Sequence, residues 1–481
     1  MMIINLLLQL PLQAAIAQQT FSGSNSVPDV TLLIDNPGTN SSTTIRTLLD
    51  AVSAKRGSPF LFGVAYDSSS NTKLNNYAIS RLNDTFNLGV AENNCKWVYT
   101  EPSRNVSDLT ACKQSRDLFT NHSASFRLHN TFWHQQTPSW LPGEFSASEL
   151  VNDIIPVHVK QEAGGMGNYV SVDVLNEIVG DSVTSGMSAY DCVANKMSWP
   201  TTRSDTDSTP FVTDLSWVES ALRAAAQSTN ATLLLNDYST GGNNSKTECY
   251  YTLARALQGD GVPLGGIGFQ SHVAAKANNF DSKGAVKATF ARFASLGLAC
   301  AITEFDVWLQ DNSTQSLRWQ AAIYGDYLDA CLYSANCHEF LVWGLYDSVS
   351  WLTTFPDRGV AMPLLFDANM VPKLNYYEVR ARLQRYLDGS GEVCASASGN
   401  TACDLKQYAT GPSSATAAAA VSSVVGSSSR ASATSARPTT GSSLPSQSAN
   451  SAVSAGTSSL EARCSLWLAL AAFGTTFLLS T

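Results

Sequence analysis

Charged residues are scarce in this chain of 481 residues. Lys, Arg, Asp and Glu make up 14% of it, against roughly 25% in an average globular protein. The 30 Lys and Arg residues are fewer than the 39 Asp and Glu residues, and they form no basic block. Because binding to a phosphate backbone needs clustered Lys and Arg, we expect no nucleic-acid partner. So low a charge indicates polar uncharged segments, a membrane-directed segment, or both.

Motifs for metals and nucleotides are also missing. The sequence has neither C-x-x-C nor H-E-x-x-H, so it predicts no metal site. No glycine-rich phosphate loop follows an early strand, which disfavours a doubly wound nucleotide-binding sheet. We therefore expect no cofactor. Aromatic residues at 9%, with ten Trp, exclude a wholly disordered chain.

The first 17 residues carry no charge and contain an apolar run. They end in Ala15-Ile16-Ala17, which is similar to a signal-peptidase site. We interpret residues 1–17 as a secretory signal peptide, although the usual positive start is missing. The alternative is a short buried helix, which the polar residues that follow at once disfavour.

The C-terminal part of the chain changes composition twice. Residues 411–459 are mostly Ser, Ala and Thr with few apolar anchors, which predicts a disordered, O-glycosylated stalk. Residues 460–481 combine a polar spacer with an apolar tail, and small residues precede them. That order is typical of a GPI-anchor signal, with an ordinary tail anchor as the alternative. We expect a protein tethered at the plasma membrane or cell wall.

Sequons for N-glycosylation are consistent with secretion. Seven of them begin at Asn40, Asn83, Asn105, Asn121, Asn230, Asn243 and Asn312.

The ten cysteines of a secreted chain should be largely disulfide-bonded. Cys464 falls in the predicted tail, so nine remain and one should be a free thiol. Cys331 and Cys337 lie close together before a predicted strand and should form a local disulfide. Other possible pairs are Cys394 with Cys403, Cys95 with Cys112, and Cys192 with Cys249.

Short apolar strand candidates alternate with longer helical stretches through the middle of the chain. The strand candidates are residues 60–66, 87–91, 125–132, 169–176, 232–236, 266–271, 300–303 and 339–343. The helix candidates include residues 212–228, 246–258, 282–296 and 314–331. Eight such units predict a parallel (β/α)8 barrel, a TIM barrel, as one catalytic domain over residues 44–387. A doubly wound sheet is the alternative.

Polar and aromatic residues gather at the ends of these predicted strands. The ends of parallel barrel strands open onto one face, where active sites lie, so residues far apart in sequence should share a cleft. The cleft would hold at least two carboxylates, with Glu92, Glu177, Asp237 and Glu304 at strand ends, together with amides, imidazoles and Trp. Two opposed carboxylates suit glycoside hydrolysis, and Trp rings suit the apolar faces of sugars.

Six segments, in order along residues 44–387, resemble glycoside hydrolase family 10, the endo-1,4-β-xylanases. Each segment is similar to a family motif: residues 91–97 to P-E-N-x-M-K-W, 127–140 to R-G-H-T-L-V-W-H-S-Q-x-P-S-W, 172–177 to W-D-V-V-N-E, 266–272 to G-I-G-x-Q-x-H, 302–306 to I-T-E-L-D, and 342–351 to V-W-G-x-x-D-x-x-S-W.

The resemblance implies retaining hydrolysis of β-1,4-xylan, with Glu177 as general acid/base and Glu304 as nucleophile. It implies two carboxyl groups about 5–5.5 Å apart, with pKa values that differ. Asn176 would bind the sugar 2-OH, and His272 would hydrogen-bond Glu304. The other substrate-binding residues that it implies are Glu92, Asn93, Lys96, His129, Trp133, Gln270, Trp343 and Trp351. Many members also have a disulfide at the positions of Cys331 and Cys337.

Four departures from the family pattern flank these groups: Leu128, Val172, Cys95 and Tyr346. They bear on fine substrate preference more than on the reaction. We expect an active monomeric xylanase of the GPI-anchored fungal type. The alternatives are a surface carbohydrate-binding or adhesion protein on an inactive barrel, and a transglycosylase or hydrolase for another β-glycan.

Overall fold

The computed structural model describes residues 43–141, 145–194, 202–204, 207–210, 212–276, 279–355 and 359–393. The predicted signal peptide, stalk and anchor signal, and the possible Cys394–Cys403 pair, lie outside these residues. Among the residues that are described, no helix is both long and apolar enough to cross a membrane.

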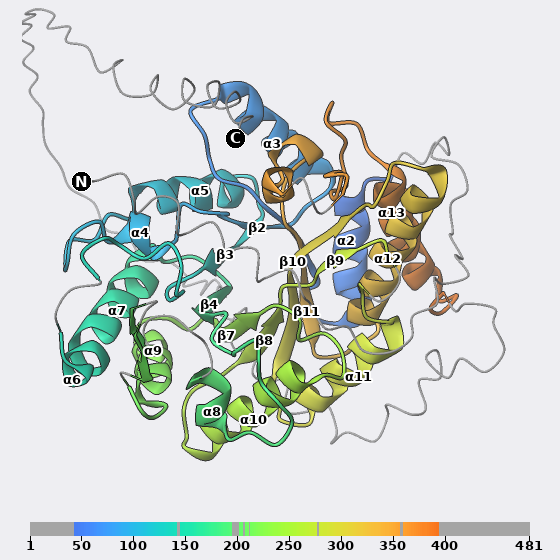
Figure 1. Cartoon of the computed structure of the whole chain (residues 1–481). Coiled ribbons are helices and arrows are strands. Elements are labelled where there is room, and N and C mark those ends of the chain that lie inside the picture. Colours follow the sequence, from blue (N-terminus) through green and yellow to red (C-terminus); the bar gives the residue numbers. More distant parts are fainter. Residues whose placement is uncertain are drawn as a thin grey trace, which may run out of the picture. The chain divides into compact units, whose positions relative to one another are not determined.

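Eight parallel strands close into a barrel (Figure 1). They are β1 (Leu61–Ala65), β2 (Leu88–Val90), β3 (Ser125–His129), β4 (Ser171–Asn176), β7 (Thr232–Asp237), β8 (Gly266–Phe269), β10 (Ala299–Trp308) and β11 (Cys337–Val342). Neighbours along the chain pair in register, and β11 pairs with both β10 and β1, which closes the ring. The predicted (β/α)8 barrel is confirmed, and the doubly wound alternative is wrong because an open sheet has two edges.

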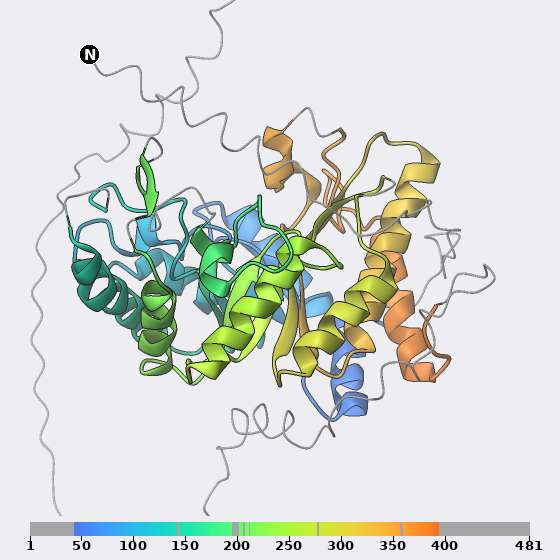
Figure 2. The ribbon, with the colours of Figure 1, turned by 60° about the horizontal axis from the view of Figure 1, so that its bottom comes forward.

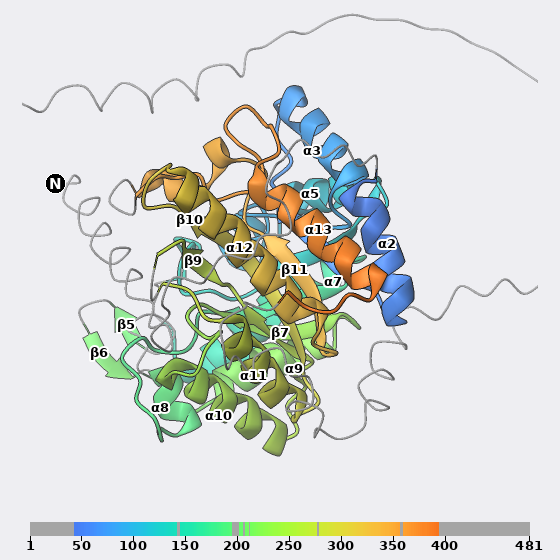
Figure 3. The same cartoon turned by 90° about the vertical axis from the view of Figure 1, so that its right-hand side faces the viewer.

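Helices cover the outside of the strands (Figures 1 and 2). They are α2 (Ile45–Arg56), α3 (Thr72–Asp84), α4 (Trp97–Thr100), α5 (Thr110–Thr120), α6 (Ala147–Glu149), α7 (Ile155–Met166), α8 (Ala189–Ala194), α9 (Ser216–Ala226), α10 (Ser245–Gly259), α11 (Lys283–Ala294), α12 (Thr314–Leu332) and α13 (Leu374–Asp388). In Figure 3, α12, α13 and α2 lie side by side. A short antiparallel hairpin, β5 (Thr202–Ser204) with β6 (Asp207–Pro210), lies between α8 and α9 in sequence.

The apolar strand runs follow from this architecture. A parallel strand covered by helices is buried on both faces, so its residues need not alternate. All six residues of β4 are buried, for example. Several helices begin at a side-chain cap that the sequence supplies: Ser282 accepts from the backbone of Ala285, and Ser313 from that of Ser316.

β10 is longer than its predicted range of residues 300–303. Its outer half, Asp306–Trp308, pairs with a short additional strand, β9 (His272–Ala274). The two strands satisfy one another's backbone groups above the barrel rim. The sequence had placed Glu304 at the end of this strand. In the structure, Glu304 lies inside β10.

A buried ion cluster crosses the barrel interior. The Arg127 side chain on β3 is 1% exposed and pairs with Asp173 on β4 and, at 2.6 Å, with Glu339 on β11. Ser171 donates to Glu339 at 3.0 Å and accepts from Arg127 at 3.2 Å. Because β3 and β11 are not neighbours in the sheet, this cluster ties opposite walls together.

Three disulfides are present: Cys95–Cys112, Cys192–Cys249 and Cys331–Cys337. All three pairings were predicted or considered possible from the sequence. Cys300 on β10 is free and buried, and it lies in register with Cys337 on β11. Burial raises the pKa of the Cys300 thiol.

We predict that Gly89→Ala destabilises the barrel. A Cβ at Gly89 on β2 would lie 2.1 Å from the Phe119 ring of α5, so the ring or the helix must move. Overpacking of this kind lowers the free energy of unfolding by about 1–3 kcal/mol, which denaturant titration would measure.

Gly164→Ala on α7 is the matched control. A Cβ there would make only ordinary contacts with Ser228, so the helix should gain about 0.5–1 kcal/mol. Equal effects of the two substitutions would show that β2 and α5 are not packed as described.

Candidate active site

The sequence-predicted site residues meet at the carboxyl ends of the barrel strands. Glu92 follows β2, His129 ends β3, Glu177 follows β4, Gln270 follows β8, and Trp343 follows β11. Asn176 ends β4. His272 begins β9, and Glu304 lies within β10. No group of three or more His, Cys, Asp or Glu in the described part of the chain is arranged to hold a metal ion.

A chain of hydrogen bonds joins the two glutamates. Gln270 Nε2 donates to Glu177 Oε1 at 2.9 Å and to Asn176 Oδ1 at 3.3 Å. Asn236 Nδ2 donates to the same Asn176 Oδ1 at 2.9 Å and to Glu304 Oε1 at 2.7 Å. Three amide side chains from β4, β7 and the end of β8 thus hold both carboxylates in one frame.

Glu177 has an unusual backbone for its residue type. Its φ is 56°, in the left-handed region, and its N–H donates to the Asn236 carbonyl at 2.8 Å. Such strain persists only where the surroundings impose it, and it is frequent at functional sites. The residue is 7% exposed, and its Oε2 has no hydrogen-bond partner among the described residues. Gln270 therefore fixes one carboxyl oxygen of Glu177, while the other makes no hydrogen bond to the described residues.

Glu304 is held as an anion. Burial raises its pKa, but His129 and His272 more than offset that effect, and the pKa is lowered overall. His272 Nε2 lies 3.3 Å from Glu304 Oε2, as expected, and His129 Nδ1 lies 3.9 Å from Oε1.

His272 is in turn held by Asp306. Its Nδ1 lies 2.9 Å from Asp306 Oδ2. Burial lowers the pKa of His272, but Asp306 and Glu304 raise it to about 10. The imidazole therefore stays protonated and positive beside Glu304 at neutral pH.

The tryptophans lie against these imidazoles. Trp351 is half-buried, donates to Asp306 Oδ2 at 2.8 Å, and has its ring centroid 4.9 Å from that of His272. Trp343 is buried and lies edge-on to His129 with a centroid separation of 5.0 Å. The Trp343 and Trp351 rings therefore cover the two imidazoles nearest to Glu304.

A second group of polar residues follows β2. Lys96 Nζ donates to Asn93 Oδ1 at 3.1 Å and lies 4.8 Å from the centroid of the Trp133 ring. Burial lowers the pKa of Lys96, although Glu304 and Glu92 act in the opposite direction. Burial, with a contribution from Asp67, raises the pKa of Glu92 to about 7.

Four residues of the site were not assigned from the sequence: Asn236, Asp306, Asp173 and Asp67. Asn236 is the penultimate residue of β7, and nothing in the sequence indicated that its amide would bridge two other strands. Asp306 stands two residues after Glu304, so the strand period places both on one face; this signal could have found it. Asp173 lies 2.9 Å from His129 Nδ1 and pairs with Arg127.

We predict that Glu92 makes stability depend on pH. Its pKa in the folded chain is raised from 4.5 to about 7, so the folded state keeps this proton longer than the unfolded state does. The stabilisation is complete below pH 4.5 and is lost as the pH rises through about 7. Glu92→Gln has no such proton, so its stability relative to wild type should rise by on the order of 1–3 kcal/mol between pH 4.5 and about 8. Denaturant titrations that give parallel pH profiles for the two proteins would contradict this.

Comparisons with known proteins agree with this geometry. A family model described as "Glycosyl hydrolase family 10" matches residues 49–382. Endo-1,4-beta-xylanase B of Thermotoga neapolitana is 31% identical over 308 residues, which cover 63% of this chain and 82% of that protein. Endo-1,4-beta-xylanase C of Phanerodontia chrysosporium is 31% identical over 330 residues, which cover 66% of this chain and 75% of that protein.

Solved structures show the same similarity. Xylanase 10B from Thermotoga petrophila RKU-1, crystallised in complex with xylobiose, has a TM-score of 0.62 and 28% identity, with 73% of this chain and 100% of that chain covered. Native xylanase 10B from Thermotoga maritima has a TM-score of 0.61 and 27% identity, with coverage of 72% and 100%. Because the family model spans more than half of the sequence and the barrel carries both glutamates, the chain belongs to glycosyl hydrolase family 10 and is a glycoside hydrolase.

Proposed function

We propose that this enzyme hydrolyses β-1,4-xylan internally and with retention of anomeric configuration. One observation carries the proposal: two buried glutamates share one network of amide hydrogen bonds, yet only Glu304 has two imidazoles beside it, of which His272 is positively charged. Two carboxyl groups in unlike surroundings are the requirement for double-displacement glycoside hydrolysis.

Glu304 is the nucleophile in this proposal. Its lowered pKa keeps it ionised at neutral pH, and its attack on the anomeric carbon forms a covalent glycosyl-enzyme intermediate. Formation of that bond neutralises the Glu304 carboxylate. His272 and the Asn236 amide stay in place, and they stabilise the carboxylate again when water releases the sugar.

Glu177 is the general acid and then the general base. Gln270 holds Oε1, so the proton is transferred from Oε2, which has no partner among the described residues. It goes to the glycosidic oxygen as the bond breaks. The resulting carboxylate then takes a proton from the water that attacks the intermediate.

Sugar binding is proposed for the residues around this pair. Asn176 presents its amide between the two glutamates, where the 2-OH of the reacting sugar would lie. Glu92, Asn93, Lys96 and Trp133 would bind the next sugar on the glycone side, with hydrogen bonds to hydroxyls and an aromatic face for the ring. That relatives are called xylanases, and that one was crystallised with xylobiose, supports xylan as the substrate.

The alternatives are less well supported. An adhesion protein on an inactive barrel would have no need for the intact pair of glutamates or its network. A transglycosylase would use the same residues, because a sugar hydroxyl can replace water in the second step. Product analysis separates these activities.

We also propose that the enzyme works as a glycosylated monomer tethered outside the cell. The six sequon asparagines that are described, all except Asn40, are exposed, and three disulfides are typical of secreted proteins. The signal-like residues 1–17, the Ser-rich residues 411–459 and the tail at 460–481 support secretion and a fungal type of GPI anchor. Release of the protein from intact cells by a phosphatidylinositol-specific phospholipase would test the anchor.

Glu304→Ala and Glu177→Ala should each lower the rate of xylan hydrolysis by roughly 10³-fold or more. Reducing-sugar release from xylan by the secreted domain measures this effect. Substantial residual activity in either variant would contradict the assignment.

An aryl β-xylobioside with an acidic phenol separates the two roles. Such a leaving group needs no proton, so Glu177→Ala should still release the phenol in a first turnover, whereas Glu304→Ala should not. Wild-type digests of xylan, mixed-linkage glucan and cellulose, followed by NMR of the first anomer formed, test the substrate and retention. A first product of inverted configuration would rule out the double displacement.

A further inference from the structure

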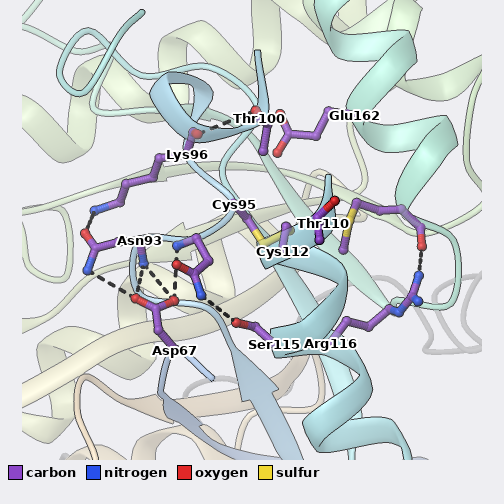
Figure 4. The surroundings of a disulfide bond; sticks show 12 residues. Asp67, Asn93, Cys95, Lys96, Thr100, Thr110, Cys112, Ser115, Arg116 and Glu162 are labelled. Atoms are coloured by element: carbon purple, nitrogen blue, oxygen red, sulfur yellow. Dashed lines mark hydrogen bonds between the residues drawn. A yellow bond between two sulfur atoms is a disulfide. The ribbon is translucent and has the colours of Figure 1, made fainter. Parts of the chain in front are cut away.

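The segment that follows β2 departs from the family pattern at Cys95, where many members have Met. This residue pairs with Cys112 in the first turn of α5, 17 positions further along the chain (Figure 4). Both cysteines are fully buried. The bond therefore ties the middle of residues 92–97, which contain Glu92, Asn93 and Lys96, to a helix outside the barrel.

Asp67, which follows β1, binds the start of the same segment. One carboxylate oxygen, Oδ2, accepts from the Asn93 backbone at 3.0 Å and from Asn93 Nδ2 at 3.3 Å. The other, Oδ1, accepts from the Asn94 backbone at 3.1 Å. The Asp67 carboxylate thus fixes both the backbone and the side-chain amide of Asn93.

The orientation of the Asn93 amide has a consequence for Lys96. Because Nδ2 faces Asp67, Oδ1 faces the other way and accepts from Lys96 Nζ at 3.1 Å. That contact holds the ammonium group 4.8 Å from the centroid of the Trp133 ring. Asp67 therefore acts, through Asn93, on where the Lys96 ammonium group lies relative to the Trp133 ring. Lys96 and Trp133 are both proposed to bind the sugar on the glycone side.

Ser115 on α5 makes the third attachment. Its Oγ accepts from Asn94 Nδ2 at 3.0 Å and from the Ser68 backbone at 3.1 Å. α5 is thereby bonded to the segment after β1 as well as to the segment after β2. Asp67, Ser115 and the Cys95–Cys112 disulfide are hereafter called the clamp.

We propose that the clamp positions Asn93 and Lys96, and so sets how tightly the enzyme binds the xylose unit on the glycone side of the bond that it cleaves. This inference rests on the proposed function. The clamp residues are positioning residues: they hold the groups that would touch the sugar. A loosened segment must be ordered when substrate binds, and that entropy weakens binding more than it slows chemistry.

The test is the dissociation constant of xylobiose, measured by calorimetry, together with kcat and KM for an aryl β-xylobioside. Asp67→Ala should weaken xylobiose binding and raise KM by about tenfold or more, with kcat changed by less than about threefold. The Cys95→Ala, Cys112→Ala double variant and Ser115→Ala should each weaken binding by about three- to tenfold. Asp67→Asn, which keeps the shape and one acceptor, should recover part of the affinity.

The Cys331→Ala, Cys337→Ala double variant is the control. It also removes one buried disulfide, but at the amino end of β11, at the opposite end of the barrel. It should change xylobiose binding by less than about twofold, even if its melting temperature falls as far as that of the other pair. Ser115→Ala keeps the test valid if a disulfide variant does not fold.

Two results separate a failure of the clamp proposal from a failure of the proposed function. If wild type hydrolyses xylan but the clamp variants bind xylobiose as wild type does, or lose kcat rather than affinity, the clamp is overturned while the proposed function stands. If wild type binds xylobiose without hydrolysing xylan, the proposed function fails, and the calorimetric comparison still decides the clamp.

Discussion

Glu304 is both ionised and buried, and the interactions at the carboxyl ends of the barrel strands depend on this constraint. A carboxylate that is only 5% exposed is strongly destabilising unless opposite charges and hydrogen bonds surround it. His129, His272 and Asn236 supply that compensation. Each imidazole is then supported by a carboxylate of its own, and Arg127 connects one of these, Asp173, to Glu339 on the far wall. The buried polar and charged side chains thus form a connected series of contacts that begins at Glu304.

This balance explains why a charge-poor sequence retains so many buried ionisable groups. Outside the site, helices and strands pack mainly through apolar surfaces, although buried ion pairs such as Arg382 with Asp329 and Lys287 with Glu392 also join α11, α12, α13 and the residues that follow α13. Inside, charges from β3, β4, β10 and β11 are arranged so that each has a partner from another strand. Removal of one partner leaves the other unpaired in a low-dielectric interior, which is far more destabilising than loss of a surface ion pair. The buried charges around the active site are therefore held in pairs that cross between strands.

The sequence predicted the barrel because eight buried parallel strands leave apolar runs of characteristic length, and it located Glu177 and Glu304 because family motifs surround them. It did not predict the length of β10, because that length depends on pairing with β9, whose residues lie 34 positions earlier in the chain. Asp67 and Asn236 were missed as functional residues for a related reason. Their side chains bond to residues that are distant in sequence and become neighbours only on folding. Neither residue lies in a motif that would show whether it supports the fold or the active site.

Cys300 has a consequence for the biosynthesis of this protein. The described residues contain three disulfides and this single thiol, which lies in register with Cys337 on the next strand. In the folded chain, burial keeps it protonated and unreactive. Before β10 and β11 are joined, however, it competes with Cys331 for the same partner. On the secretory route that we propose, correct oxidation requires that β10 and β11 pair before the disulfide forms, or that a wrong Cys300–Cys337 bond is later exchanged. A disulfide isomerase should then matter more for this barrel than its small number of disulfides suggests.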